Sequence, residues 1–122
     1  MNRAYIFPTG FIWGASTAAH QIEGNNVASD WWVREHALHT DVHEPSGDAA
    51  DSYNRYEAGI RLLANAGWGM YRFSVEWARI EPAEGCFSKV ELLHYRRMID
   101  VCHANGVEPM VTLTHMTLPL WL

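Results

Sequence analysis

The 122-residue sequence predicts an α/β fold in which parallel strands alternate with helices. Short apolar segments of strand length alternate with stretches of helical periodicity, in the order strand, helix, strand, helix, strand. This order is typical of parallel βα units. The apolar fraction of 48% is that of an ordinary globular protein, and the length suits one small domain with a single core.

The first strand is predicted at residues 11–15, ahead of a polar stretch and a long loop at residues 25–47 with one helical turn. A helix is expected over residues 49–65, because apolar side chains recur there on one face. These side chains are Tyr53, Tyr56, Ile60 and Leu63. Gly67 follows, where a chain leaving a helix often adopts the left-handed conformation that glycine accepts at little cost.

Three histidines in the loop raise the question of a metal site. His36, His39 and His43 are spaced so that a helix would align them on one face. Pro45 and Gly47 indicate a loop instead, and no cysteine or second histidine cluster completes a ligand set. The sequence therefore predicts neither a metal ion nor another cofactor.

Residues 70–75 form the second predicted strand, whose interior is polar for a parallel sheet. Alternation places Arg72, Ser74 and Glu76 on one face, although helices usually cover both faces of such a sheet. Two interpretations stay open on this pattern. Either Arg72 points into the end of a barrel where active-site residues gather, or the strand is an edge strand with one solvated face. In the first case Arg72 needs an acidic partner, since an unpaired buried charge is costly.

A loop at residues 81–87 precedes a second helix, and a third strand follows that helix. Ser88 and Glu91 match the capping box with which many helices begin, and Gly106 ends the helix. Its apolar stripe is expected to consist of Leu92, Tyr95, Ile99 and Cys102. The third strand is predicted at residues 107–114.

Charge and composition exclude several classes of protein. The net charge is −5 with acidic and basic residues mixed, whereas a nucleic-acid surface needs a basic stripe. No apolar stretch approaches the roughly 18 residues of a membrane span, and residues 1–10 do not have the pattern of a signal peptide. Cys86 and Cys102 do not make a disulfide framework. We expect a cytoplasmic protein with free thiols and no nucleic-acid or membrane partner.

Three segments resemble motifs of a single enzyme family, glycoside hydrolase family 1 of the β-glucosidase type. Residues 7–24, FPTGFIWGASTAAHQIEG, resemble its N-terminal signature. Residues 71–82, YRFSVEWARIEP, resemble its second-strand motif, and residues 111–119, VTLTHMTLP, resemble the end of its third strand. The first helix also matches at Asp51, Tyr53 and Tyr56. The resemblance is collinear and extends over nearly the whole chain.

The resemblance implies that residues 1–122 are the N-terminal fragment of a single (β/α)8 TIM-barrel domain, with about three of its βα units. Such enzymes hydrolyse β-linked glycosides with retention, using two carboxylates roughly 5 Å apart. In the family the acid/base glutamate follows an asparagine, and the nucleophile lies in a Thr-Glu-Asn-Gly-like motif. The sequence contains neither Asn-Glu nor Glu-Asn-Gly. We therefore expect no catalytic residue here, assign Glu23 and Glu76 to structure or solvent, and expect the isolated chain to be inactive.

The resemblance also implies roles for three residues. Gln21 is expected to bond hydroxyls of the non-reducing sugar, and His115 to contact a neighbouring hydroxyl, so this segment builds the glycone subsite. Arg72 is expected to pair with the nucleophile and keep it ionised. The three belong near the C-terminal rim of a barrel, and an amide and an imidazole each offer a donor and an acceptor to a hydroxyl. Each has a simpler alternative. Gln21 is then an ordinary loop residue, His115 makes a hydrogen bond at the strand end, and Arg72 forms a structural ion pair.

Some positions depart from the family pattern. Met116 stands where an aromatic is usual, which puts one stacking contact in doubt, and Thr117 replaces a common aspartate. Ala58 and Gly59 replace acidic residues of the first helix, so sugar preference stays open. The expected partners are a β-glycoside or oligosaccharide and the rest of the barrel, although a chain that dimerises to cover its sheet is the alternative. A non-catalytic module that binds sugar or a partner, and a different barrel hydrolase, also stay open.

Overall fold

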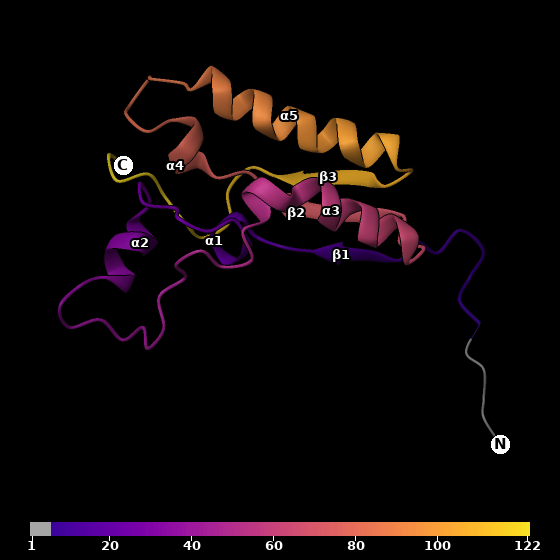
Figure 1. Ribbon diagram of the computed structural model, residues 1–122, viewed down its shortest axis with the longest axis horizontal. Helices are drawn as coiled ribbons and strands as arrows, with labels where there is room; N and C mark the ends of the chain where they lie inside the picture. Colours follow the sequence, from indigo (N-terminus) through magenta and orange to yellow (C-terminus); the bar gives the residue numbers. More distant parts are fainter. Residues whose placement is uncertain (1–5) are drawn as a thin grey trace.

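The computed structural model describes residues 6–122, which form a three-stranded parallel sheet with two long helices packed against it (Figure 1). Strand β2 lies in the centre, between β1 and β3. The strands are β1 Gly14–Ser16, β2 Met70–Ser74 and β3 Glu108–Thr112. The helices are α1 Ala19–Ile22, α2 Asp30–Glu35, α3 Ser52–Asn65, α4 Trp77–Ile80 and α5 Lys89–Ala104. The predicted order of strands and long helices is confirmed, as is their parallel direction.

The hydrophobic core lies between one face of the sheet and helices α3 and α5. Tyr71 and Phe73 of β2 point into it, as the alternation predicted, and Ile60 contributes from α3. The remaining core side chains are Tyr95, Met98, Cys102 and Val107. Within residues 6–122 the opposite face of the sheet carries no helix, so Arg72 and Met110 are exposed there.

Helix α3 begins at Ser52, three residues later than predicted. Ala49 and Asp51 have φ angles of +47° and +51°, and this left-handed backbone does not continue a right-handed helix. The predicted apolar face is confirmed, with Ile60 fully buried and Tyr56 and Leu63 packed against the core. Gly67 has a φ of +80°, as expected after a helix end.

The first strand was placed too early. Phe11 and Trp13 pack against each other and against Phe7, with ring centroids 4.6–5.0 Å apart, and form an exposed aromatic cluster before the sheet. Pairing begins beyond this cluster, at Gly14 opposite Met70. Apolar character at residues 11–13 therefore reflects contacts among aromatic rings rather than strand pairing.

The buried stripe of α5 differs from the prediction at its first turn. Leu92 is 47% exposed, and His94 is buried in its place. The cause is the ring of Tyr53, which stacks on His94 with centroids 3.9 Å apart. Tyr95 and Cys102 of the predicted stripe are buried as expected.

The capping box of α5 is confirmed only in its first half. The Ser88 hydroxyl accepts a hydrogen bond from the Glu91 N–H at 3.4 Å. The Glu91 carboxylate does not return to Ser88; it accepts from the Tyr53 hydroxyl at 2.9 Å, while the Ser88 N–H donates to the Ile80 carbonyl.

Helix α5 is the longest helix in residues 6–122, and no helix among these residues has both the length and the apolar character that crossing a membrane requires.

Candidate functional site

The three residues singled out by sequence lie on the face and edge of the sheet that the long helices leave open. Gln21 is exposed in α1, directly after β1. Arg72 is exposed in β2, and half-buried His115 follows the end of β3. Because the strands are parallel, the segments carrying Gln21 and His115 leave the same edge of the sheet. No hydrogen bond joins the three side chains in the described part of the chain.

Arg72 lies opposite Ser16 in the register of β1 and β2. Its Nε and Nη2 atoms donate to the Ser16 hydroxyl at 2.9 and 2.5 Å. Among residues 6–122 no carboxylate lies within ion-pair distance of this guanidinium. The edge-strand interpretation is wrong, because β2 pairs on both sides and Arg72 points from a central strand.

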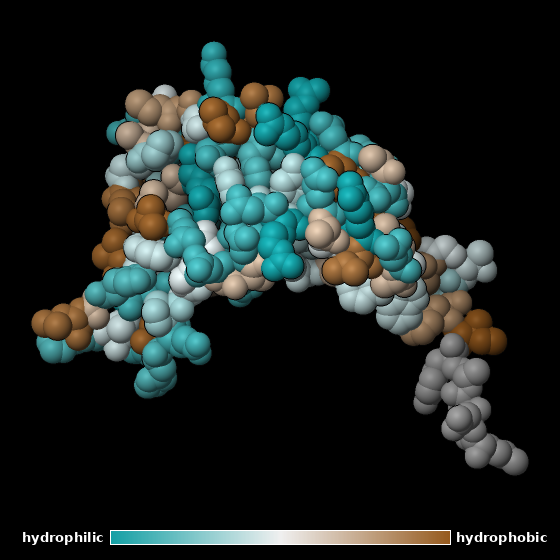
Figure 2. Space-filling view, viewed as in Figure 1, coloured by the Kyte–Doolittle hydropathy of each residue, from teal (hydrophilic) through white to brown (hydrophobic). Residues whose placement is uncertain are grey.

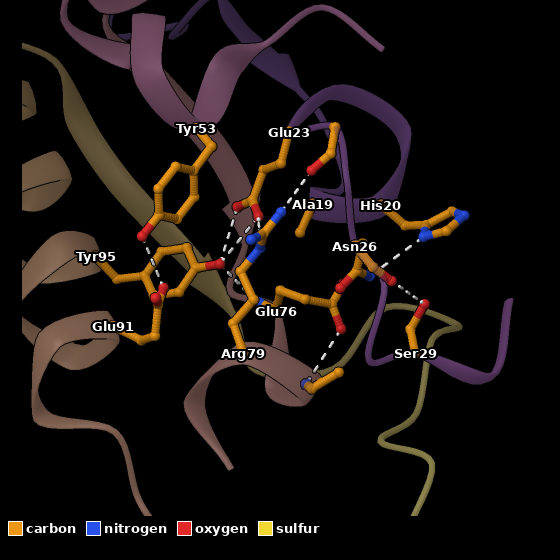
Figure 3. Close-up of polar contacts among 12 residues, drawn as sticks. Ala19, His20, Glu23, Asn26, Ser29, Tyr53, Glu76, Arg79, Glu91 and Tyr95 are labelled. Carbon is orange, nitrogen blue, oxygen red and sulfur yellow. Dashed lines mark hydrogen bonds and ion pairs between the residues drawn. The ribbon is translucent and has the colours of Figure 1, made fainter. Parts of the chain in front are cut away.

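Below the rim, Glu23 is the centre of a buried polar network. The Tyr95 hydroxyl donates to both of its carboxylate oxygens, at 3.0 and 3.1 Å, and the Arg79 Nε donates at 3.1 Å (Figure 3). Arg79 also donates to the Gly24 carbonyl. Burial raises the pKa of Glu23 to about 7, and Arg79 and Tyr95 oppose that rise in part. Glu23 is 4% exposed, and these donors engage both of its carboxylate oxygens.

Glu76 is joined to the same network through the Tyr95 oxygen, which accepts from the Glu76 N–H at 3.0 Å. Its carboxylate accepts from the Thr117 hydroxyl at 2.9 and 3.1 Å and from the Ala78 N–H at 3.3 Å. Burial raises the pKa of this carboxyl group as well. At 1% exposure Glu76 is buried like Glu23.

A second buried cluster anchors α1 to α2 and to the loop before α3. His20 Nε2 lies 2.8 Å from Glu35 Oε1. Glu35 Oε2 accepts from both the N–H and the hydroxyl of Ser46, at 3.1 and 2.7 Å. Burial alone would raise the pKa of Glu35, but the hydrogen bonds from His20 and Ser46 outweigh it and lower the pKa. This cluster fixes the segment that precedes Gln21.

The three loop histidines lie apart from these clusters. His36, His39 and His43 are exposed, and His36 Nδ1 lies 2.8 Å from the Trp32 carbonyl at the end of α2. Within residues 6–122 no group of three or more histidine, cysteine, aspartate or glutamate side chains is arranged to hold a metal ion.

Sequence reasoning missed the partners that organise the rim, namely Arg79, Tyr95 and Thr117. Tyr95 was expected only as an apolar stripe residue, and its contact with Glu23 joins positions 72 residues apart. No local pattern reports such a pairing. A buried tyrosine does need a hydrogen-bond partner, however, so its hydroxyl was a usable signal.

The parallel βα sheet is an N-terminal part of a (β/α)8 barrel, the fold of the solved structures on which it superimposes. The family model of Glycosyl hydrolase family 1 matches residues 3–122, and the chain belongs to this family.

Relatives with known names agree with the family. Thermostable beta-glucosidase B of Thermobispora bispora is 42% identical over 118 residues, covering 93% of this chain and 25% of that protein. A solved β-glycosidase superimposes with a TM-score of 0.91 at 55% identity, covering 94% of this chain and 28% of that one. The solved Thermotoga maritima β-glucosidase in complex with glucoimidazole has a TM-score of 0.87 at 36% identity, with coverage of 94% and 28%. The chain spans about a quarter of the length of the relatives it matches.

Proposed function

We propose that this chain is part of a retaining β-glycosidase and that it builds the glycone subsite through Gln21 and His115. The observation that carries the proposal is the common edge of the sheet from which both residues project, one exposed and one half-buried. Side chains that can both donate and accept suit the hydroxyl groups of a sugar. The Thermotoga maritima relative binds glucoimidazole, which supports a sugar-like ligand.

Arg72 is assigned to the nucleophile, a carboxylate that the remaining strands of the barrel supply. Support comes from its place on the open face of a central strand, where within residues 6–122 its guanidinium hydrogen-bonds only to the Ser16 hydroxyl. A guanidinium pairs with a carboxylate through two parallel hydrogen bonds, which an ammonium does not reproduce. An arginine in that position keeps the nucleophile ionised.

The chemistry itself is assigned to carboxylates outside this chain. Glu23 and Glu76 are both buried and engaged by structural donors, which leaves neither free for a glycosidic bond. Residues 1–122 are accordingly one portion of a single barrel domain. A cytoplasmic location is part of the proposal, since Cys86 and Cys102 are free thiols.

Two proteins test this function. The isolated chain is expected to release no nitrophenol from an aryl β-glucoside, because it lacks both catalytic groups. A chimaera in which this chain replaces the matching quarter of the Thermotoga maritima β-glucosidase is expected to be active. In that chimaera Gln21→Ala should lower kcat/KM by roughly tenfold or more, the loss expected when a sugar hydroxyl loses a partner.

The outcomes separate the proposal from its alternative. Activity of the isolated chain that disappears on substitution of Glu23 or Glu76 overturns the assignment of the chemistry. A folded but inactive chimaera, or one indifferent to Gln21→Ala and His115→Ala, favours a non-catalytic module.

A further inference from the structure

The turn that carries His115 has an unfavourable backbone conformation. Met116 has a φ of +57°, in the left-handed region that residues with a Cβ rarely adopt. The Thr117 N–H donates to the His115 carbonyl at 2.9 Å and closes the turn around Met116. A conformation of this kind costs free energy and persists only where neighbouring groups hold it.

The groups that hold the turn are buried. Thr117 is 4% exposed, and its hydroxyl donates to both oxygens of the Glu76 carboxylate, at 2.9 and 3.1 Å. A carboxylate is a stronger acceptor for a hydroxyl than a neutral group is. The Leu118 N–H donates to Asp30 at 2.8 Å and fixes the chain on the far side of the turn.

Glu76 is itself held in place, so it can act as a fixed anchor. Its carboxylate accepts from the Ala78 N–H, and its own N–H donates to the Tyr95 hydroxyl. Glu76 lies two residues after the end of β2. The residue between them, Val75, donates its N–H to the Thr112 carbonyl at the end of β3. The anchor and the end of β3 are thus tied together, and the turn between them has little freedom.

We propose that Glu76 and Thr117 are positioning residues for His115: their hydrogen bonds hold the left-handed turn at Met116 and so aim the imidazole at the sugar. The inference rests on the proposed function, because His115 must contact the substrate for its position to matter. Neither Glu76 nor Thr117 touches the sugar.

The test is a double-mutant cycle in the chimaera. Thr117→Val keeps the shape of the side chain and removes the hydroxyl, whereas Thr117→Ser keeps the hydroxyl. Thr117→Val is expected to raise KM for the aryl β-glucoside by about fivefold, the typical effect of one hydrogen bond, and Thr117→Ser to restore it. In a His115→Ala background Thr117→Val should change KM no further, since residues that act through one contact are not additive.

Ser88→Ala is the matched control for lost stability. It removes the helix cap of α5, away from the turn, and should lower Tm without changing KM. If Thr117→Val changes KM equally with His115 and without it, or only lowers Tm as Ser88→Ala does, the positioning role is wrong. If His115→Ala alone leaves KM unchanged, the proposed function fails instead.

Crystal structures of the chimaera and its Thr117→Val variant give a readout that does not need activity. The variant is expected to lose the positive φ at Met116 and to show a rotated or disordered His115 side chain. An unchanged turn and imidazole in the variant overturns the inference even where the chimaera is inactive.

Discussion

Glu23 illustrates how a single buried group makes stability depend on pH. Its carboxyl group receives donors from Tyr95 and Arg79, yet burial still raises its pKa from 4.5 to about 7. A raised pKa in the folded state means that folding favours the protonated form. Its contribution to stability is therefore full below pH 4.5 and is lost as the pH rises through about 7, a change of about 3 kcal/mol.

Replacing Glu23 by Gln should remove this pH dependence, because an amide does not titrate. In the chimaera, the protein with Glu23 is expected to lose stability between pH 5 and pH 8 relative to its Glu23→Gln variant. Glu76 shifts in the same direction and is present in both proteins. Denaturant midpoints at fixed protein concentration measure the effect. The control is Glu57→Gln, which changes an exposed ion pair with Arg61 on α3. If stability changes with pH in the same way with Glu23 and with Gln at this position, the pH dependence does not come from Glu23.

Arg72 allows a prediction about rate rather than stability. In the active chimaera Arg72→Met should raise the pKa of the nucleophile, because the positive charge that favours its ionised form is gone. The acidic limb of kcat/KM against pH should then move to higher pH, with turnover affected more than substrate binding. Gln21→Ala should leave that limb in place. A variant with an unchanged profile and only a lower Tm would make Arg72 a structural residue.

At the scale of residues, the sequence indicated the three candidate site residues better than the residues that hydrogen-bond around them. Gln21, Arg72 and His115 stand in contiguous motifs, so their positions could be inferred from neighbours along the chain. Thr117 was noted only as a departure from a family pattern, and its role depends on a hydrogen bond to Glu76, 41 residues away. Pairings at such separations depend on the folded topology, which periodicity does not report.

At the scale of elements, the end of α1 meets the loop before α3 at a very close approach. Gly24 has a φ of +81°, and a Cβ placed there would lie 2.2 Å from the Asp48 carbonyl oxygen. The Asn25 N–H donates to the Gly47 carbonyl at 2.7 Å across the same contact. The α1 segment is thus packed directly on backbone, and only glycine fits.

Gly24→Ala and Gly67→Ala form a matched pair that separates conformation from contact. Gly67 has a φ of +80° but no atom within 4 Å of a built Cβ. Gly67→Ala should cost about 1 kcal/mol, the penalty of a left-handed backbone for alanine. Gly24→Ala should lower the free energy of unfolding by at least twice as much, because the backbone at Asp48 must also move away from the added Cβ. The Gly24 carbonyl, which accepts a hydrogen bond from Arg79, would move as well. Urea unfolding of the two variants in the chimaera measures both costs, and equal costs would mean that the close approach relaxes freely.

The elements that sequence predicted well are those with several turns of periodicity. Helices α3 and α5 have 14 and 16 residues and show repeated apolar spacing. Helices α1 and α4 have four residues each, which is too few to show the 3.6-residue spacing of apolar side chains. Both lie inside the segments that resemble family motifs, where no such spacing could be sought. The start of β1 was misplaced because the aromatic cluster of residues 7–13 is as apolar as a strand.

At the scale of the whole molecule, apolar surfaces lie open on both sides of the sheet. A groove of about 380 Å³ runs between α3, β1 and β2, and apolar side chains including Ile60 and Leu63 line it. On the other side, Met110 and Leu113 are exposed by 47% and 75%. Figure 2 shows hydrophilic side chains over much of the face formed by α3 and α5, with several apolar ones at its left edge near α2 and the C-terminus. In the proposed barrel the remaining strands and helices cover these surfaces.

The isolated chain is therefore expected to self-associate at micromolar concentration, since unpaired sheet edges and apolar faces promote contacts between copies. Sedimentation velocity should show oligomers or larger species, and the chimaera should sediment as its parent does. A monodisperse monomer of 122 residues with a cooperative two-state transition would contradict this expectation and the barrel portion behind it.

The hydrogen bond between Tyr95 and Glu23 also has a consequence for synthesis on the ribosome. The two residues are 72 positions apart, so the N-terminal motif lacks its anchor until α5 has been translated. At roughly 5–20 residues per second this interval lasts about 4–14 s. During that time the carboxylate of Glu23 remains solvated, and the nascent segment with Gln21 is open to chaperones and proteases. The segment around Glu23 is thus translated 72 residues ahead of the tyrosine that fixes it.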